Sequence, residues 1–258
     1  MSLFTHRSVG EDIARYLPRS LELCLYSALL ILMMGVLLGT ISAVFKNSWI
    51  DNVIRVFTYF GVVTPPYAFA IFFMLLFSYS LRLFPIGGVP VMPAEYVRTG
   101  ALGLDALLAG DFALYGKVMH SMFLPVLSLS IGGIAYQTRI HRSAMVENIN
   151  ADYIAFARVA GVGNGKLIFK HLMKPSFIPT FTVYGLQVAS LLGNAFIIEV
   201  LFRYQGFSQY SLSVIMNKDP YGIVGVTLIF GIIFAVVNVL IDMGVSVLDP
   251  RIGLRGEA

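Results

Sequence analysis

Five apolar stretches, each long enough to cross a lipid bilayer, constrain this chain more than any other feature. They cover residues 21–45, 56–81, 118–138, 177–198 and 222–248. Because a helix rises about 1.5 Å per residue, about 20 apolar residues cross the roughly 30 Å hydrocarbon layer. A backbone in that layer must satisfy its own hydrogen bonds, which a helix does within one segment. The sequence therefore predicts an all-α integral membrane protein with about five transmembrane helices, contained in residues 21–250.

The composition excludes several classes of protein. Only 12% of the residues are charged and 57% are hydrophobic, whereas soluble domains carry about 25% charged residues. The net charge of +4 is dispersed, without the dense basic patch that nucleic-acid binding requires. The single cysteine, Cys24, excludes an intrachain disulfide, and the four scattered histidines show no metal-ligand spacing. We predict no metal site, no nucleic-acid partner and no catalytic residue set.

Prolines before the first span and inside the second predict where helices end or bend. Residues 1–20 are polar and mixed in charge, so we expect them to lie outside the hydrocarbon layer. Within them, the stretch from Glu11 to Pro18 predicts a short interfacial helix that ends at the proline. In the second span, the sequence Thr64-Pro65-Pro66 predicts a kink or a local opening of the helix.

A polar interval at residues 149–175 separates the third and fourth spans. Ile149, Tyr153, Phe156 and Ala160 recur at helical spacing and predict one apolar face of a short helix. A glycine-rich turn is expected next, because Gly and Asn readily adopt positive φ; it contains Gly161, Gly163, Asn164 and Gly165. A second short helix is expected over residues 166–173, ending at Pro175.

The same interval presents a basic surface on one side of the membrane. Its basic residues are Arg158, Lys166, Lys170, His171 and Lys174. The simplest interpretation is a loop that lies against anionic lipid headgroups. A nucleotide-binding P-loop is excluded, because Ala160 and Leu167 occupy positions where that motif needs Gly and Ser or Thr.

This interval resembles the cytoplasmic signature loop of ATP-binding cassette (ABC) importer permeases, whose pattern is Glu-Ala-Ala, three residues, Gly, then an apolar run closing near Leu-Pro. Ala157 matches the second Ala and Gly161 the Gly, whereas Ala155 departs from the Glu. Residues 157–161 read Ala-Arg-Val-Ala-Gly, close to the Ala-Arg-Ala-Lys-Gly of the peptide branch. The resemblance implies a coupling helix that docks on an ATPase, and its docking residues would be Ala157, Arg158, Gly161, Gly165 and Lys166.

The resemblance extends over nearly the whole chain. The segments that resemble peptide-permease motifs are residues 15–23 (RYLPRSLEL), 84–88 (FPIGG), 120–127 (HSMFLPVL), 199–202 (EVLF) with 206–207 (GF), and 238–252. Two positions depart: Tyr204-Gln205 lacks the expected Pro, and Ser208 replaces a Gly. Together the segments are similar to the B-type permease of dipeptide, oligopeptide or nickel importers, with the transmembrane domain of a type I ABC importer.

The resemblance also implies partners and a location. These are a second, related permease, two ATP-binding cassette ATPases and an extracytoplasmic solute-binding protein, in the cell membrane of a prokaryote. The binding protein would dock on the loops at residues 82–117 and 199–221. ATP and magnesium would bind only to the ATPases, so this chain would carry no cofactor and would not be an enzyme. The cargo would be a peptide or a related solute, such as an oligosaccharide or a nickel chelate.

The orientation follows from the resemblance and from the basic residues. With the signature loop inside, ten of the 18 Lys and Arg residues are cytoplasmic and eight are external, which is the expected direction. Arg139 and Arg142 then anchor the cytoplasmic end of the third span, residues 251–258 form a cytoplasmic tail, and residues 1–20 are external. In the family a further helix precedes the stretch that matches Glu11 to Phe45, and we expect this helix to be missing here.

Polar groups within the last span leave alternatives open. Asn238 and Asp242 are costly in lipid, so we expect them to face a cavity or gate, although Asp242 fits an interfacial position equally well. One alternative function is an ion-gradient-coupled secondary transporter, which would favour inverted repeats and charged mid-membrane sites. Another is a non-transport membrane scaffold, which would need no ATPase partner.

Overall fold

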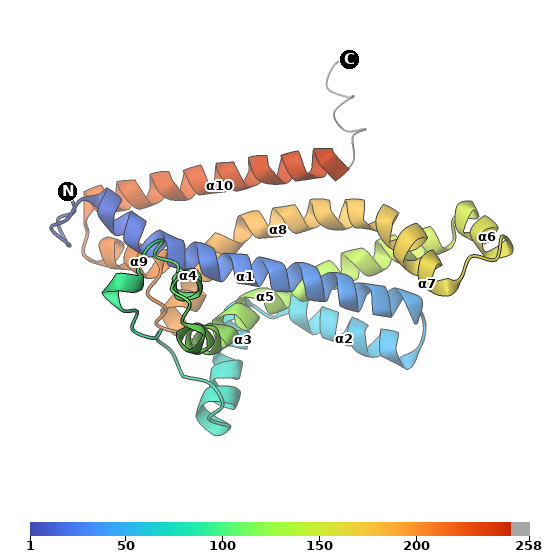
Figure 1. The fold of residues 1–258 in the computed structure, drawn as a ribbon, viewed down its shortest axis with the longest axis horizontal. Helices are drawn as coiled ribbons and strands as arrows, with labels where there is room; N and C mark the ends of the chain where they lie inside the picture. Colours follow the sequence, from blue (N-terminus) through green and yellow to red (C-terminus); the bar gives the residue numbers. More distant parts are fainter. Residues whose placement is uncertain (249–258) are drawn as a thin grey trace, which may run out of the picture. The chain divides into compact units, whose positions relative to one another are not determined.

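The computed structural model describes residues 1–248, with the side chains of residues 242 and 245–248 excepted. The described part is helical throughout, apart from its turns and loops (Figure 1). The chain forms two compact units. Unit 1 comprises Met1–Leu29, Pro65–Ile131 and Ser190–Ala235; unit 2 comprises Leu30–Thr64, Gly132–Ala189 and, within the described part, residues 236–248.

The helices follow one another in a simple order. They are α1 (Val9–Val44), α2 (Trp49–Val63), α3 (Pro66–Phe73), the π-helix η1 (Met74–Ser80), the 3₁₀-helix η2 (Ala94–Tyr96), α4 (Leu102–Leu108), α5 (Phe112–Ile149), α6 (Asp152–Val159), α7 (Asn164–Lys166), the π-helix η3 (Leu167–Leu172), α8 (Met173–Leu201), α9 (Phe207–Met216) and α10 (Pro220–Leu248). The all-α membrane architecture expected from the apolar stretches is confirmed.

Four helical segments in the described residues are long and apolar enough to cross a membrane. They are Val9–Val44, Phe112–Ile149, Asn164–Leu201 and Pro220–Ile241. A fifth candidate is the pair Trp49–Val63 and Pro66–Ser80, if the two bent halves count as one span. Between them, Thr64 and Pro65 are extended, with ψ of 124° and 147°. The break therefore falls at the prolines, where the sequence predicted a kink.

Helix α1 begins at Val9 and continues through Pro18, so the expected separate helix ending at this proline is wrong. A proline inside a helix costs about 3 kcal/mol through a lost hydrogen bond and a steric clash. Packing offsets this cost: Ile13 is buried in a cluster of unit 1 against α9, and Tyr16 and Leu17 pack on the same cluster. Tertiary contacts of the helical turns just before Pro18 therefore help to hold the helix in place.

The second proline expectation also fails, because the chain stays helical through Pro175. The residues before it, Leu167–Leu172, form a π-helix, in which Met173 donates its backbone N–H to the Ile168 carbonyl. A π-turn is wider than an α-turn and is a usual way of accommodating a local disruption inside a helix. This widened turn lets α7, η3 and α8 continue as one helical segment from Asn164 to Leu201.

In unit 2, α1 and α5 approach closely at two glycines. A Cβ on Gly35 would lie 2.6 Å from Gln137 Cβ, and one on Gly39 would lie 2.9 Å from His141 Cβ and from the Thr138 carbonyl oxygen. Gly35 and Gly39 form a Gly-x-x-x-Gly pair, a spacing that lets helix backbones approach in membranes. The motif is visible in the sequence, but hydropathy alone does not single it out, because both glycines lie inside an apolar stretch.

We expect Gly39→Ala to destabilise the protein by about 1–3 kcal/mol, because the added methyl group meets backbone and a buried ring. The midpoint of thermal unfolding in detergent measures this effect. Gly116→Ala on α5 is the matched control, since its Cβ would have no heavy atom within 4 Å among the described residues. An alanine in such a helical position is stabilising by about 0.5–1 kcal/mol. Equal midpoints for the two variants would contradict the close helix approach.

Unit 1 is built on a cluster between α1, α9 and α10. Its buried members include Ile13, Phe207 and Tyr210, and the rings of Tyr16 and Tyr210 stack at 5.3 Å. At the start of α10, Asp219 accepts hydrogen bonds from Ser2 Oγ (2.5 Å) and from the Gly222 amide (3.2 Å). Burial alone would raise the pKa of Asp219, but these hydrogen bonds lower it to about 2. The N-terminal segment is thereby attached to the same unit as α9.

Candidate functional site

The signature segment, residues 149–175 in unit 2, is built around a helix end at Gly161. Helix α6 ends at Val159 with Ala160 as its C-cap, and the next residue, Gly161, has a φ of +76°. The Gly161 amide donates to the Arg158 carbonyl (3.0 Å), and the Val162 amide donates to the Ala157 carbonyl (3.0 Å). This pair of bonds is a Schellman motif, which needs a left-handed residue at the first position after the cap. Gly161 therefore has the conformation that the sequence predicted.

One face of α6 packs inward and the other is exposed. Ile154 and Ala157 are buried in a cluster with Ala43 of α1, Met145 of α5 and the residues that follow the turn. Phe156 is 75% exposed and Val159 89% exposed. Of the four residues predicted to form one apolar face, Tyr153, Phe156 and Ala160 are exposed, whereas Ile149 belongs to α5 and packs against the buried cluster. Ala157 is buried, so a partner that docks on α6 would contact the exposed residues beside it, such as Phe156 and Val159.

The basic residues of the segment lie on its exposed side. Arg158, Lys166 and Lys170 are exposed, whereas His171 is half-buried. Gly165 does not belong to the turn, because the helix resumes at Asn164 and Gly165 lies inside α7. Phe169 is 70% exposed and adds apolar surface beyond the turn. The segment therefore combines exposed aromatic side chains with positive charge, on a base that is packed against α1 and α5.

Substitutions at two glycines of this segment should act in opposite directions. Gly161→Ala should destabilise the segment by about 1–2 kcal/mol, because an L-residue is strained at a φ of +76°. Gly165→Ala should stabilise it by about 0.5–1 kcal/mol, since Gly165 is helical and its Cβ would have no heavy atom within 4 Å in the described residues. Amide hydrogen exchange over α6 and α7 measures both effects; faster exchange in Gly165→Ala would contradict the assignment.

The two predicted anchors at the end of the third span behave differently. Arg142 donates from Nε to Asp51 Oδ1 and from Nη2 to Oδ2, both at 2.7 Å. Asp51 is completely buried and also accepts from Ser42 Oγ (2.5 Å) and the Asn47 amide (2.9 Å). Arg139 is exposed, with its guanidinium carbon 5.1 Å from the centre of the Tyr136 ring. Arg142 thus fastens α5 to the start of α2 within unit 2.

Sequence interpretation missed Asp51, which falls between the predicted spans at residues 21–45 and 56–81. Ser48 is the N-cap of α2, and its Oγ accepts from the Asp51 amide at 3.3 Å. The Asp51 side chain in turn accepts from the amide of Asn47, the residue before the cap. The pattern Ser-x-x-Asp before an apolar run is the sequence signal of such a helix start. It would have placed the beginning of α2 at Trp49 and identified Asp51 as a helix-end residue.

A buried polar ladder joins α1, α5 and α8 inside unit 2. His141 contacts Thr40 Oγ1 through Nε2 (3.1 Å) and Thr180 Oγ1 through Nδ1 (2.9 Å). Gln137 donates to the Thr180 carbonyl (2.7 Å) and accepts from Gln187 (3.0 Å). Gln137 and His141 are one helical turn apart, so their side chains leave α5 on the same face. Buried hydrogen bonds of this kind fix the contacts between helices within a membrane.

The polar residues predicted for a cavity in the last span are described only in part. Asn238 is half-buried on α10 in unit 2 and has an interaction partner. The side chain of Asp242 lies outside the described residues. Their role in a cavity or gate therefore stays a prediction.

Several of the motif segments meet in unit 1. The Gly88 amide donates to the Phe202 carbonyl at 2.8 Å, and Gly87 lies so close that a Cβ there would collide with the Phe202 backbone. Phe84 stacks on His120 with ring centres 4.8 Å apart, and His120 Nε2 lies 2.8 Å from the Leu83 carbonyl oxygen. Loops that are far apart in the sequence are thereby held together by backbone and ring contacts.

A buried carboxylate holds another junction of unit 1. Glu199, at the end of α8, accepts from Ser20 Oγ and from the Ser208 amide (2.9 Å). The Ser20 hydroxyl in turn accepts from the Phe207 amide at 2.7 Å. A Cβ on Gly206 would lie 2.5 Å from both Ser20 Oγ and Glu199 Oε2, so only glycine fits there. Glu199 therefore fixes the first turn of α9 against α1.

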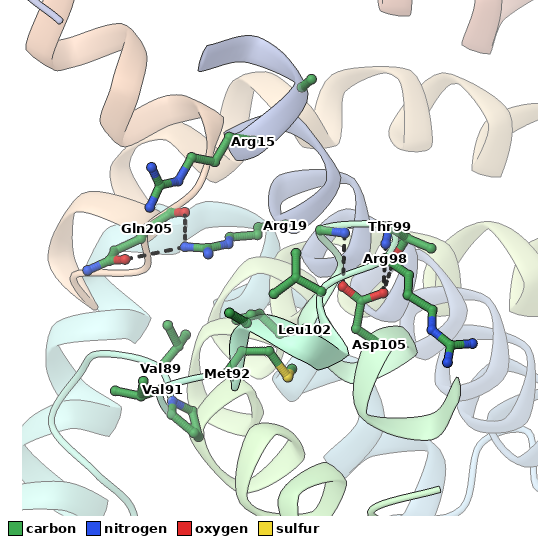
Figure 2. Close-up of a pocket in the computed structure, with 15 residues that line it drawn as sticks. Arg15, Arg19, Val89, Val91, Met92, Arg98, Thr99, Leu102, Asp105 and Gln205 are labelled. Atoms are coloured by element: carbon green, nitrogen blue, oxygen red, sulfur yellow. Dashed lines mark hydrogen bonds between the residues drawn. The ribbon is translucent and has the colours of Figure 1, made fainter. Parts of the chain in front are cut away.

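Beside this junction, unit 1 contains a cavity of about 720 Å³ lined by three arginines (Figure 2). Arg19 donates from Nη1 to the carbonyl oxygen (3.2 Å) and Oε1 (3.3 Å) of Gln205, and its buried Nε has no partner among the described residues. Arg15 and Arg98 line the same cavity and are exposed. Its lining carboxylate, Asp105, is buried and already accepts from Thr99 and the Gly100 amide. The cavity is suited to an anionic group.

Comparison with known proteins agrees with this architecture. The family described as binding-protein-dependent transport system inner membrane component matches residues 35–254. The probable D,D-dipeptide transport system permease protein DdpB of Escherichia coli (strain K12) is 31% identical over 99% of this chain and 76% of its own. The dipeptide transport system permease protein DppB of Alkalihalophilus pseudofirmus is 31% identical over 97% of this chain and 76% of its own.

A solved structure with little sequence identity has a similar fold. It is the crystal structure of an amino acid ABC transporter with histidines, which matches with a TM-score of 0.58 and 15% identity. The match covers 91% of this chain and 92% of the other. At this identity the likeness concerns the arrangement of the helices alone.

Proposed function

We propose that this chain, which belongs to the family of binding-protein-dependent transport system inner membrane components, is the permease subunit of an ATP-driven importer of short peptides. The family places it in the bacterial inner membrane as a multi-pass protein. Relatives about 31% identical are named as dipeptide permeases, which supports a peptide cargo. ATP hydrolysis would occur on separate subunits, and this chain would supply the path through the membrane.

The exposed side of α6 is the observation that carries the proposal. Phe156 and Val159 present apolar surface to solvent, with Arg158 between them in sequence. Exposed apolar side chains rimmed by charge are typical of protein docking sites. We infer that two copies of an ATPase dock on such helices, one on this chain and one on a second permease. Arg158 and Lys166 would lie at the rim of this contact.

The base of α6 can transmit a movement of the docked ATPase. Ile154 and Ala157 pack against Met145 of α5, Ala43 of α1 and Leu172, next to the start of α8. Because these contacts are buried and close-packed, a displacement of α6 must displace the attached helix ends. Transmembrane helices that move together in this way give alternating access of a central path. Asn238 and Asp242 remain proposed polar groups of that path.

The arginine-lined cavity of unit 1 is the proposed contact for the external binding protein. It lies between the start of α1, the loop at residues 89–100 and Gln205 (Figure 2). Both loops that the sequence assigned to this role, residues 82–117 and 199–221, contribute to it. Carboxylates on a binding protein would pair with Arg15 and Arg98, whose side chains are exposed.

Transport by the reconstituted complex tests the function. The chain is purified with its permease partner and ATPases, inserted into proteoliposomes, and supplied with a binding protein and a labelled dipeptide. We expect ATP-dependent uptake, and an ATPase rate that rises when the loaded binding protein is added. An otherwise identical complex with an inactive ATPase is the control. Dipeptide uptake that persists with the inactive ATPase and follows an ion gradient would overturn the proposal.

A further inference from the structure

Unit 2 contains a second, smaller cavity that the proposed transport function does not use. It has a volume of about 220 Å³ and lies between α1, α2 and α5. Hydroxyl and guanidinium groups dominate its lining. The lining residues are Ser42, Ile54, Arg55, Thr58, Tyr59, Thr138, Arg139, Arg142 and Ser143. We call it the α2–α5 pocket.

The α2–α5 pocket carries an excess of positive charge. Arg142 uses two nitrogens on Asp51, and Arg55 Nε lies 3.7 Å from the same carboxylate. Arg139 lines the pocket without any acidic partner in the part of the chain that the structure describes. Two guanidinium groups therefore share one carboxylate and the third has none, so two positive charges remain for a ligand. A divalent cation is excluded by this sign, whereas an oxyanion is favoured.

A buried hydroxyl in the lining points to the same kind of ligand. Thr138 is completely buried, yet its Oγ1 has no hydrogen-bond partner among the described residues. Arg55 Nε is likewise buried and without a hydrogen bond within those residues. Buried polar groups are almost always satisfied by a partner. A ligand oxygen in the pocket would accept from both groups and complete their hydrogen bonding.

The surroundings of the pocket indicate lipid. The outward face of α2 is apolar and exposed, with Val53, Val56 and Phe60 between 54% and 69% exposed. Trp49, at the start of α2, is 75% exposed, as expected for a residue at the membrane–water interface. Arg55 Nη2 donates to Asn52, back toward that start, so its guanidinium extends toward the headgroup level.

We propose that the α2–α5 pocket binds the phosphate of an anionic phospholipid in the leaflet on the side of the signature segment. Its volume accommodates a phosphate and adjacent glycerol, and basic pockets between transmembrane helices favour such headgroups. The acyl chains would lie along the apolar face of α2. Ser42 lines the pocket, and the next residue, Ala43, belongs to the cluster beneath α6. The bound lipid would therefore lie beside the base of the signature segment, and its binding does not depend on the transport proposal.

Lipid binding by the purified full-length chain tests the proposal. Binding of short-chain phosphatidylglycerol, short-chain phosphatidylcholine and inorganic phosphate is measured by native mass spectrometry and by titration in detergent. We expect phosphatidylglycerol to bind at least about tenfold more tightly than phosphatidylcholine, because the phosphocholine headgroup is neutral overall. Inorganic phosphate should bind weakly, since it lacks acyl chains to cover α2.

Three variants locate the site. Arg55→Gln combined with Arg139→Gln should weaken phosphatidylglycerol binding about tenfold or more, while Arg142, which holds Asp51, is left intact. Thr138→Val should weaken it severalfold without loss of fold, since the hydroxyl has no partner within the described chain. Lys46→Gln is the matched control: Lys46 is exposed near the same end of α1 but does not line the pocket.

Each outcome decides the assignment. Equal phosphatidylglycerol affinity in the wild type, the double variant and Thr138→Val would overturn the site. Binding of inorganic phosphate that depends on Arg139 and Thr138, without tighter binding of the lipid, would assign the pocket to a soluble phosphate and overturn the lipid. If the double variant fails to fold, the affinity of Thr138→Val for phosphatidylglycerol still gives the answer.

Discussion

Replacement of Asp51 by alanine is expected to destabilise the protein by about 3–5 kcal/mol, the usual cost of removing one partner of a buried ion pair. Asp51 is fully buried, and the variant would leave the Arg142 guanidinium, the Ser42 hydroxyl and the Asn47 amide without their acceptor. For a chain of this size the thermal midpoint in detergent should fall by roughly 6–20 °C. Size-exclusion chromatography after heating measures that midpoint.

A double-mutant cycle separates the ion pair from other effects of the substitution. Asp51→Ala combined with Arg142→Ala should cost less than the sum of the two single variants, because the second change removes the uncompensated charge. Glu147→Ala is the control, since Glu147 is an exposed carboxylate on the same helix as Arg142. A midpoint of Asp51→Ala equal to that of Glu147→Ala would show that the pair contributes no stability.

The sequence predicted the helices far better than the contacts between them. Apolar length alone predicted an all-α membrane protein with about five spans, because the bilayer fixes how long an apolar helix must be. The pair of Asp51 and Arg142 was not predictable in that way, since the two residues are 91 positions apart. Only the packing of α1, α2 and α5 brings them together, and hydropathy carries no information on which faces meet.

Local rules failed where tertiary packing opposed them. The rule that a proline ends a helix was wrong at Pro18, where Ile13 and Leu17 pack on a cluster of unit 1. It was wrong again at Pro175, where a π-helical turn precedes the proline. It was right at Pro65, where α2 has ended at Val63 and α3 begins only at Pro66. The difference lies in the contacts around each proline, which a sequence does not display.

The sequence predicted the helix end in the signature segment, but only the structure shows which residues of α6 are exposed. The positive φ of Gly161 followed from the motif, because a helix end of this kind requires glycine or asparagine. The exposed face of α6 did not follow, since periodicity shows that a face is apolar but not whether it is covered. The structure buries Ile154 and Ala157 and leaves Phe156 in solvent. That assignment leads to a sharp prediction for docking.

Replacement of Phe156 by glutamate is expected to weaken ATPase binding at least about 30-fold, which corresponds to the roughly 2 kcal/mol that defines an interface hot spot. The Phe156 side chain is 75% exposed, so the variant should fold and insert as the wild type does. Its ring would be the largest apolar contact that α6 can offer to a groove. Co-purification of the ATPase with tagged permease in mild detergent, followed by titration, measures the loss.

The matched control places the same charge one residue earlier. Ala155 is also exposed on α6, and Ala155→Glu restores the acidic residue of the signature pattern. Successive residues on a helix point about 100° apart, so this glutamate leaves the Phe156 ring in place. We expect Ala155→Glu to bind the ATPase within about threefold of the wild type, since exposed charges contribute little. If instead both variants bind as the wild type does, α6 is not the docking helix. If both lose binding, added negative charge is the cause and Phe156 has no special role.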